Sequence, residues 1–259
     1  MLPAQRRDWL VDRLRTDGRL VAKDLAVELD VSEDSVRRDL RELAAAGLCQ
    51  RVYGGALPVS PAVADYATRQ EVETESKRRV AAAAAALVVP GSTVILDGGT
   101  TTLAVTQALP RDLSATVVTH SPTIAAALAD HVDVEVFLLG GRLFRHSMVT
   151  CGAAAVEAAQ AVTADVFLLG VTGVHHEAGL TTGDSDEAAM KRALARRAAD
   201  TYVLASAEKV GAASRFSVLP LSAVSAVVTD ARPDDPAVQQ LVAAGARLLG
   251  PPDQATANG

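Results

Sequence analysis

Arginine side chains gather in one short segment of this 259-residue chain, at Arg37, Arg38 and Arg41. A guanidinium group can pair with guanine through two hydrogen bonds or bind a phosphate as a fork. On a helix that enters a DNA groove, the first side chains reach base edges and others contact phosphates. The segment and the residues after it are therefore predicted to bind DNA. The expected contacts are Ser32, Ser35, Arg37, Arg38, Arg41, Arg51, Tyr53 and Gly54.

The surrounding sequence predicts the elements that would present these side chains. Apolar residues at helical spacing indicate a first helix around Trp9–Leu14 and a second over Val21–Leu29. The hydroxyl of Ser32 can cap a third helix, and Gly47 can end that helix in a left-handed conformation. Arg51 to Gly55 would then form a short β wing, so the pattern predicts a winged helix-turn-helix.

This predicted DNA-binding domain, residues 1–58, is electrically neutral as a whole. It contains ten Lys and Arg and ten Asp and Glu residues, whereas residues 59–259 carry the entire net charge of −6. Non-specific affinity for DNA rises with the number of phosphates that are neutralised. We therefore expect weak non-specific binding, for which two copies per operator would compensate. The alternative for this unit is an ordinary three-helix domain with a solvated charged face.

The remainder of the chain predicts a Rossmann-like α/β domain over residues 75–250. Short β-branched runs alternate with Ala-rich helical stretches, which is typical of a parallel sheet covered by helices on both faces. The predicted strands are residues 93–97, 115–119, 134–139, 165–169, 202–205, 224–229 and 246–249. In such sheets small molecules bind beyond the carboxyl ends of the strands.

Glycine and polar residues follow these predicted strands and indicate one small-molecule site. The run 98–102 (GGTTT) could bind phosphate through free N–H groups at a helix start and through threonine hydroxyls. Lysines at 77, 191 and 209 could neutralise an anionic group. The residues expected on this basis are Lys77, Gly99, Thr100, Thr101, Thr102, His120, Ser121, Gly140, Gly141, Lys191 and Lys209. Two plainer alternatives stay open: GGTTT can simply begin a helix, and Lys191 can pair with Glu187 along one helix.

Composition argues against several other classes of protein. Apolar residues make up 49% of the chain, but the longest uncharged apolar run, Val80–Val89, is too short to span a bilayer. The N-terminus has no apolar signal core. Cys49, Cys151 and the histidines show no zinc-ligand spacing, so we expect reduced thiols, a cytoplasmic location, no metal and no cofactor. Residues 59–74 are predicted to be a linker and residues 251–259 a disordered tail.

The sequence resembles the DeoR-type bacterial transcription regulators. The run DVSEDSVRRDLRELAAAGLCQRVYGGA is similar to their recognition helix and wing, and LDGGTTT, VVTHS, LLGG and VTGVHHEAGLTTGDSDEAAMKRAL follow in the order of their effector domain. The likeness covers roughly residues 3–235. It implies an effector domain similar in fold to phosphosugar isomerases, with Asp97 and Glu187 added to a sugar-phosphate pocket. It also implies a homo-oligomer, a dimer or tetramer, that binds double-stranded operator DNA.

Two segments depart from the family's usual pattern. His120 stands where asparagine is usual, and Ala205 stands where a carboxylate is usual, while Glu208 introduces a carboxylate beside Lys209. These changes could alter the sugar that binds or weaken the site.

The expected function is sequence-specific regulation of transcription, most simply as a repressor of sugar-metabolism genes that a phosphorylated sugar releases from DNA. One alternative is a sugar-phosphate isomerase or deaminase with an added helical domain, in which Glu187 or Asp184 would be the base. A second alternative is a DNA-binding regulator whose pocket is vestigial.

Overall fold

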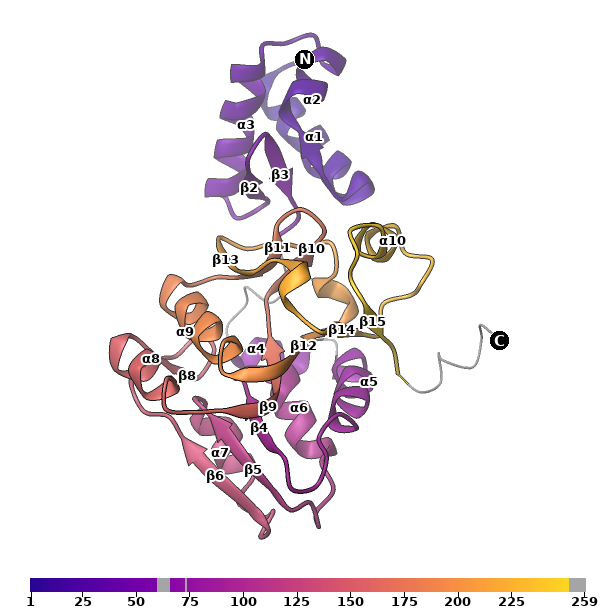
Figure 1. Cartoon of the computed structure of the whole chain (residues 1–259). Helices are drawn as coiled ribbons and strands as arrows, with labels where there is room; N and C mark the ends of the chain where they lie inside the picture. The colour runs from indigo at the N-terminus through magenta and orange to yellow at the C-terminus, as the bar shows by residue number, and fades with distance from the viewer. Residues whose placement is uncertain (60–65, 73, 252–259) are drawn as a thin grey trace.

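The computed structural model describes residues 1–59, 66–72 and 74–251 of the chain. A small N-terminal unit stands at one end of a larger α/β domain (Figure 1). The predicted linker therefore lies partly outside the described residues, and the predicted tail lies outside them from residue 252 onward. Across the described ranges, no helix has the length and apolar character needed to cross a membrane.

The N-terminal unit is a winged helix-turn-helix. Its elements are α1 (Pro3–Asp17), β1 (Leu20–Val21), α2 (Ala22–Glu28), α3 (Glu33–Ala45), β2 (Gln50–Val52) and β3 (Gly55–Leu57). Ser32 caps α3 by accepting a hydrogen bond from the Ser35 N–H at 3.2 Å, and Gly47 adopts a left-handed φ of 73° just beyond the helix. The apolar faces of the helices meet in a small core that includes Leu10, Val36 and Leu40.

The two glycines of the wing have different structural roles. Gly54 lies in the turn between β2 and β3 with a left-handed φ of 78°, which favours glycine. Gly55 starts β3, which pairs with both β1 and β2. A Cβ at Gly55 would lie 1.8 Å from the carbonyl oxygen of Leu20, so only glycine allows this close backbone approach.

The larger domain is built on a seven-stranded parallel sheet. Its strands are β4 (Thr93–Leu96), β5 (Ala115–Thr119), β6 (Val134–Leu138), β9 (Ala164–Gly170), β12 (Ala198–Ala205), β14 (Ala226–Thr229) and β15 (Leu248–Leu249). Its helices are α4 (Tyr66–Glu71), α5 (Thr74–Ala85), α6 (Thr100–Ala108), α7 (Pro122–Ala127), α8 (Ala153–Ala159), α9 (Ser185–Ala195) and α10 (Pro236–Ala243). Alternate residues of one strand enter opposite core layers: Ile95 belongs to one apolar cluster, and Val94 and Leu96 belong to the other. The predicted α/β fold is therefore confirmed.

The order of strands creates a crevice in the middle of the sheet. The order is β15-β14-β12-β9-β4-β5-β6, so the chain proceeds from β4 toward one edge and later from β9 toward the other. The connections that leave β4 and β9 diverge at this point, which is where open α/β sheets bind ligands. A site is therefore expected at the carboxyl ends of β4 and β9.

Short antiparallel strands stand above this crevice, and the sequence pattern did not predict them. They are β7 (Arg142–Phe144), β8 (Val149–Cys151), β10 (Gly173–His175), β11 (Gly179–Thr182) and β13 (Phe216–Leu219). The strands β10, β11 and β13 form one small sheet, and β7 pairs with β8. The strands β10, β11 and β13 lie between the parallel sheet and the winged unit in Figure 1, and β8 lies beside α8 at the side of the larger domain.

The close backbone contact at Gly55 predicts an asymmetry between the two wing glycines. Gly55→Ala should disrupt the β1–β3 pairing and lower both the stability of the winged unit and its affinity for DNA, because the added methyl group meets the backbone of Leu20. Gly54→Asn should be far milder, because asparagine tolerates a left-handed φ and no atom lies within 4 Å of its Cβ position. Urea unfolding of both variants measures the difference. Equal stabilities would contradict this account of the wing.

Candidate functional site

The recognition helix α3 presents a basic face that is exposed along its length. Arg38 and Arg41 lie one turn apart, are exposed, and form no ion pair with any described residue. Arg37 is also exposed, but it pairs with Glu33 at 2.7 Å. Ser35 lies beside the cap, with its hydroxyl 2.9 Å from that of Ser32. Arg38 and Arg41 are therefore the arginines of α3 best placed to bind DNA.

The wing continues this basic face. The side chain of Tyr53 is fully exposed at the tip, and Arg51 is exposed beside it. Arg37, Arg51 and Gly54 border one small hollow between α3 and the wing. Their contacts with DNA stay predictions, but the fold places them together with the α3 arginines in one unit.

Two of the acidic residues in the winged unit pair with arginines of α1 and not with the basic face of α3. Asp39 is buried on α3 and accepts a hydrogen bond from Arg6 of α1 at 2.5 Å. Glu42 of α3 forms an ion pair with Arg7 of α1. These acidic groups hold α1 against α3, so they leave the charges of Arg38 and Arg41 uncompensated at the surface.

The larger domain contains a pocket at the crevice between β4 and β9. Gly98–Thr102, after β4, and Gly170–Thr172, at the end of β9, line its floor. Eight of the predicted effector residues line it: Lys77, Gly99, Thr100, Thr101, Thr102, Glu187, Lys191 and Lys209. The fold therefore brings these side chains together from α5, α6, α9 and the segment after β12.

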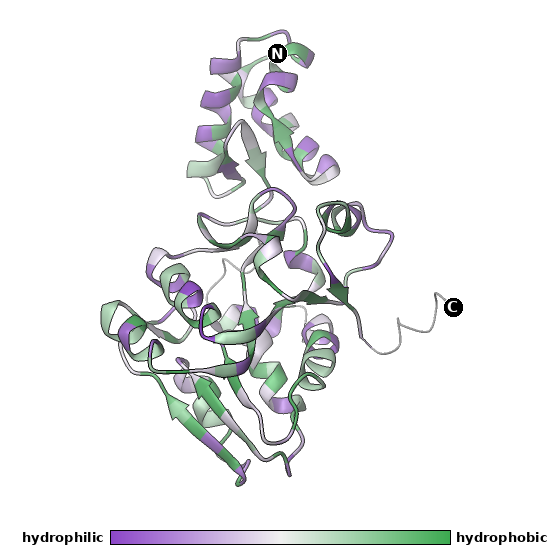
Figure 2. Cartoon of the chain, in the orientation of Figure 1, coloured by the Kyte–Doolittle hydropathy of each residue, from purple (hydrophilic) through white to green (hydrophobic). Residues whose placement is uncertain are grey.

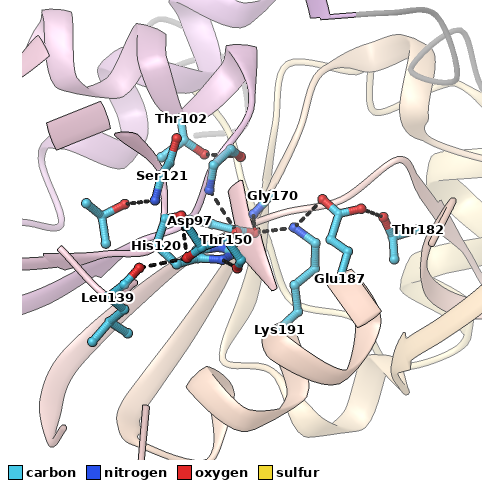
Figure 3. Close-up of polar contacts among 12 residues, drawn as sticks. Asp97, Thr102, His120, Ser121, Leu139, Thr150, Gly170, Thr182, Glu187 and Lys191 are labelled. Atoms are coloured by element: carbon cyan, nitrogen blue, oxygen red, sulfur yellow. Dashed lines mark hydrogen bonds and ion pairs between the residues drawn. The ribbon is translucent and has the colours of Figure 1, made fainter. Parts of the chain in front are cut away.

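Asp97 supports this pocket from beneath. Its carboxylate is completely buried and accepts hydrogen bonds from the Gly98 and Gly170 N–H groups, both at 2.8 Å (Figure 3). It also contacts Lys191 Nζ at 2.5 Å and His120 Nε2 at 2.7 Å. Burial alone would raise the pKa of Asp97, but the Lys191 and His120 contacts outweigh burial and lower it to about 2. Asp97 is therefore a buried, charged anchor beneath the pocket, and its predicted contact with an effector stays a prediction.

Glu187 and Lys191 extend this charge network into the pocket. Glu187 accepts a hydrogen bond from the Thr182 hydroxyl at 2.5 Å and lies 3.4 Å from Lys191 Nζ. Burial opposes the charged form of both groups, but the pKa of Glu187 is lowered by Lys191 and Thr182. The pKa of Lys191 is raised by Asp97 and Glu187 against the effect of burial. The helical pair proposed for Lys191 is therefore real, and it belongs to the wall of the pocket.

Lys209 is the cation at the opposite wall. Its ammonium group is buried and donates a hydrogen bond to Thr101 Oγ1 at 2.9 Å. Burial lowers the pKa of Lys209 to about 8, while Glu208 acts in the opposite direction. Its charge is therefore sensitive to an anion placed nearby. The first-turn N–H groups of α6, at Thr100–Thr102, have no partner inside the helix and border the same pocket.

Five of the predicted effector residues do not line the pocket. Asp97, His120 and Ser121 are buried beneath or beside it. The ring of His120 lies between two acceptors: Nε2 contacts Asp97, and Nδ1 is 2.8 Å from the Thr150 carbonyl oxygen. Gly140 and Gly141 lie exposed after β6, because β6 is the edge strand and ends away from the crevice. The resemblance indicated residues that follow strands of the sheet. Spacing in the sequence could not show how far each strand end lies from the crevice between β4 and β9.

Other lining residues were not predicted as effector contacts. Arg69 and Val72 come from the segment that we predicted to be a linker, where α4 forms, and Ser147 comes from the turn between β7 and β8. Thr182 lies just before the Asp184 cap of α9. An aspartate three residues before a glutamate is a sequence signal for the start of a helix, and Asp184 and Glu187 have this spacing. The short strand that carries Thr182 gives no comparable signal.

The β10–β11 turn contacts the winged unit. Arg19, which follows α1, forms an ion pair with Glu177 at 2.7 Å. His175 Nδ1 accepts the backbone N–H groups of Glu177 and Ala178, at 3.1 and 3.3 Å. Burial, followed by the neighbouring His176, lowers the pKa of His175 to about 4. The turn therefore contacts the winged unit through Glu177, and His175 accepts hydrogen bonds from the backbone of the same turn.

Comparisons with known proteins agree with this arrangement in both units. A model of the DeoR-like helix-turn-helix domain matches residues 6–62, and a model of the DeoR C-terminal sensor domain matches residues 72–231. The chain belongs to the DeoR family. Its winged unit is that family's DNA-binding domain, and this DeoR-family protein is a DNA-binding regulator of transcription.

Relatives align with this DeoR-family chain over nearly its whole length. It is 34% identical to the HTH-type transcriptional regulator GlpR of Haloferax volcanii, over 96% of this chain and 98% of that protein. It is 30% identical to the glycerol-3-phosphate regulon repressor of Escherichia coli strain K12, over 93% of this chain and 96% of that protein. Among solved structures, ribose 5-phosphate isomerase A of Neisseria gonorrhoeae is similar at 18% identity over 57% of this chain and 56% of that chain, with a TM-score of 0.39. That structural similarity is too low to carry a functional argument.

Removing Lys191 should destabilise the protein most near neutral pH, where Asp97 and Glu187 are charged. The folded-state pKa of Asp97, about 2, lies below its ordinary value of 3.8, so its contribution to stability is present above about pH 4 and is lost as the pH falls toward 2. Lys191→Met should raise this pKa and cost about 3–5 kcal/mol at neutral pH, because two buried carboxylates lose their partner, and the difference from wild type should shrink as the pH falls below about 4 and Asp97 is protonated.

Urea unfolding followed by circular dichroism from pH 2 to 7 measures both effects. The double variant Asp97→Asn, Lys191→Met is the matched control, because it removes both charges and should be less destabilised than Lys191→Met alone. A difference between Lys191→Met and wild type that stays the same from pH 7 to pH 2 would show that the network is not an electrostatic anchor.

Proposed function

We propose that this regulator represses genes of sugar or polyol metabolism and leaves its operator when a phosphorylated sugar or polyol binds the pocket. The observation that carries the proposal is the Lys209 ammonium group beside the start of α6, with Thr101 bonded to it at 2.9 Å. Ammonium, hydroxyl and free helix N–H groups together suit a phosphate. A bound dianion would favour the charged form of Lys209, whose pKa burial has lowered.

The opposite wall of the pocket suits the rest of a sugar. Glu187 and Thr182 offer hydrogen-bonding atoms that are already held in place, and Lys191 is fixed by Asp97. A polyol chain could therefore extend from the phosphate end toward Glu187. The E. coli relative that is named as a glycerol-3-phosphate regulon repressor supports a phosphorylated polyol as one candidate.

The pocket also offers a route by which a ligand would affect DNA binding. Thr172 borders the pocket and a second cavity between the larger domain and the winged unit, where Arg51 and Asp184 also lie. Asp184 caps α9, the helix that carries Glu187 and Lys191. A ligand that shifts α9 or Thr172 would change this contact, and release requires different ligand affinity in the two arrangements.

An isomerase or deaminase activity is a weaker proposal. The carboxylate of Asp184 is occupied by the N–H groups of Asp186 and Glu187, and Glu187 is held in its charged form by Lys191. The lowered pKa makes Glu187 a weak base, and Asp184 does not line the pocket. The purified protein should therefore leave sugar phosphates chemically unchanged, which product analysis would test.

The first experiment is binding of the protein to DNA upstream of its own gene, by fluorescence anisotropy at a stated salt concentration, with a panel of sugar and polyol phosphates. Specific binding that one compound releases supports the proposal. Specific binding that no compound releases would indicate a vestigial pocket, and no specific binding would contradict the operator prediction.

Arg38→Ala should weaken specific operator binding by about 5- to 150-fold, which corresponds to the roughly 1–3 kcal/mol of a bidentate arginine contact. Arg38 is exposed and unpaired with any described residue, so the fold should be unaffected. Arg111→Ala removes an exposed arginine of the larger domain and is the matched control. Anisotropy titrations measure both, and wild-type affinity in Arg38→Ala would remove this side chain from the interface.

Thr101→Val should weaken the response to the effector without weakening operator binding. The change keeps the shape of the side chain but removes the hydroxyl that bonds Lys209. We expect a higher effector concentration for half-maximal release, by about fivefold or more for one lost hydrogen bond to a charged group. Thr106→Val, on the same helix but away from the pocket lining, is the control. Release identical to wild type would place the phosphate elsewhere.

A further inference from the structure

Glu208 lines the effector pocket, but the proposed function gives its carboxylate no role. It comes immediately before Lys209, in the single 3₁₀ turn Ala207–Lys209 that follows β12. It is also one of the positions at which the chain departs from its family's usual sequence. The strands of the parallel sheet are largely hydrophobic in Figure 2, so a carboxylate at the end of β12 is an isolated charge and not part of a charged surface.

The carboxylate of Glu208 is held through one of its two oxygens. Ser206, which is fully buried, donates a hydrogen bond from Oγ to Glu208 Oε1 at 2.6 Å. The second oxygen, Oε2, is buried and accepts no hydrogen bond from any residue that the structure describes. An acceptor that is buried without a donor raises the free energy of the protein. Oε2 therefore gains from a donor that a ligand brings into the pocket.

The charged groups nearby do not supply this donor. The ammonium group of Lys209 donates to Thr101 Oγ1 at 2.9 Å. Glu187, the other carboxylate that lines the pocket, already accepts a hydrogen bond from Thr182 and pairs with Lys191. Of the two lining carboxylates, Glu208 is therefore the one that keeps an oxygen for a ligand. The residue is partly exposed, so the carboxylate can turn toward the pocket.

Glu208 also acts against a simple anion at Lys209. Burial lowers the pKa of Lys209 to about 8, and the Glu208 carboxylate opposes this because it favours the charged ammonium group. The carboxylate is therefore close enough to act on any group bound at Lys209, and it repels a phosphate there. Such repulsion gives specificity when the intended ligand offsets it with a contact that its competitors lack.

We propose that Glu208 determines effector specificity by accepting a hydrogen bond from a hydroxyl or ammonium group that the effector carries close to its phosphate. The effector is then a phosphate ester with a hydrogen-bond donor near the ester oxygen, and inorganic phosphate and donor-free alkyl phosphates are disfavoured. The proposal rests on the proposed function, because it places the phosphate at Lys209. It adds a recognition point at the phosphate end of the pocket, separate from the wall that contains Glu187.

Three esters with the same three-carbon chain test this contact. Propyl phosphate has no donor on its chain, glycerol 3-phosphate has hydroxyl groups, and 3-aminopropyl phosphate has an ammonium group. Phosphorus NMR titrations of the full chain measure the dissociation constant of each ester and of inorganic phosphate. In the wild-type protein, at least one ester with a donor should bind about tenfold or more tightly than propyl phosphate, which is the effect of a hydrogen bond to a charged group. The ester that does so identifies the donor as hydroxyl or ammonium.

Glu208→Ala should change the affinities in opposite directions. The preference for the ester with the donor should fall by about tenfold, whereas the affinity for inorganic phosphate should rise because a neighbouring negative charge is lost. A variant that merely loosened the pocket would weaken both. Glu208→Gln keeps an acceptor oxygen without the charge, so it should retain a preference for a hydroxyl and lose one for an ammonium group. Glu157→Ala removes an exposed glutamate of α8, outside the pocket lining, and is the matched control.

Circular dichroism shows whether each variant is folded. An unchanged preference in a folded Glu208→Ala variant would overturn the proposal and leave the phosphate site at Lys209 intact. Equal binding of the three esters by the wild-type chain would overturn it as well. Thr101→Val, in contrast, should weaken all the esters alike, because it acts on the phosphate. A wild-type chain that binds none of them would contradict both this proposal and the effector of the proposed function.

Discussion

The buried carboxylate of Asp97 is the constraint on which the effector pocket depends. It joins the end of β4 to the end of β9 through Gly170, to α9 through Lys191, and to the end of β5 through His120. A buried charge of this kind is tolerated only when it is paired and hydrogen-bonded. The pairing therefore fixes the positions of four segments at once, and the pocket is the space that they leave between them.

The effector itself is best placed to contact the outer members of this network, because Asp97 is fully buried. Glu187 and Lys191 line the pocket and form an ion pair with each other. Their positions therefore do not depend on a ligand being present. Lys209 donates a hydrogen bond to Thr101 and has Glu208 as a neighbouring charge, and its lowered pKa makes it the more responsive charge. The pocket thus combines a fixed wall, suited to recognising hydroxyl groups, with a cationic wall, suited to phosphate. This division favours a phosphorylated polyol or sugar over a simple anion.

The fold was largely predictable because its patterns are strong, and the site was predictable only in part. The amphipathic spacing of Val36, Leu40 and Leu43, with a serine cap before them, was sufficient to place α3. Buried β-branched runs were sufficient to place the parallel strands.

The strands β10 and β11 are too short and too rich in glycine to show the alternation of apolar and polar residues that predicts a strand. Nonetheless Thr182 of β11 lines the pocket, and Glu177 in the turn between the two strands contacts the winged unit. Arg69 was missed for a related reason: a six-residue helix flanked by polar residues has the composition of a linker. Gly140 and Gly141 do not line the pocket as expected. Sequence order shows which residues follow a strand but not where that strand lies in the sheet.

The charge balance of the winged unit has a consequence for specificity. Because Asp39 and Glu42 are used to hold α1 against α3, the basic face has a few exposed arginines rather than a broad positive surface. Few phosphate contacts mean weak non-specific binding and a modest dependence on salt. On this account, discrimination comes from base contacts and from the predicted binding of two copies per operator. A ligand that changes how Arg19 and Glu177 hold the winged unit against the larger domain would then change the spacing that such recognition requires.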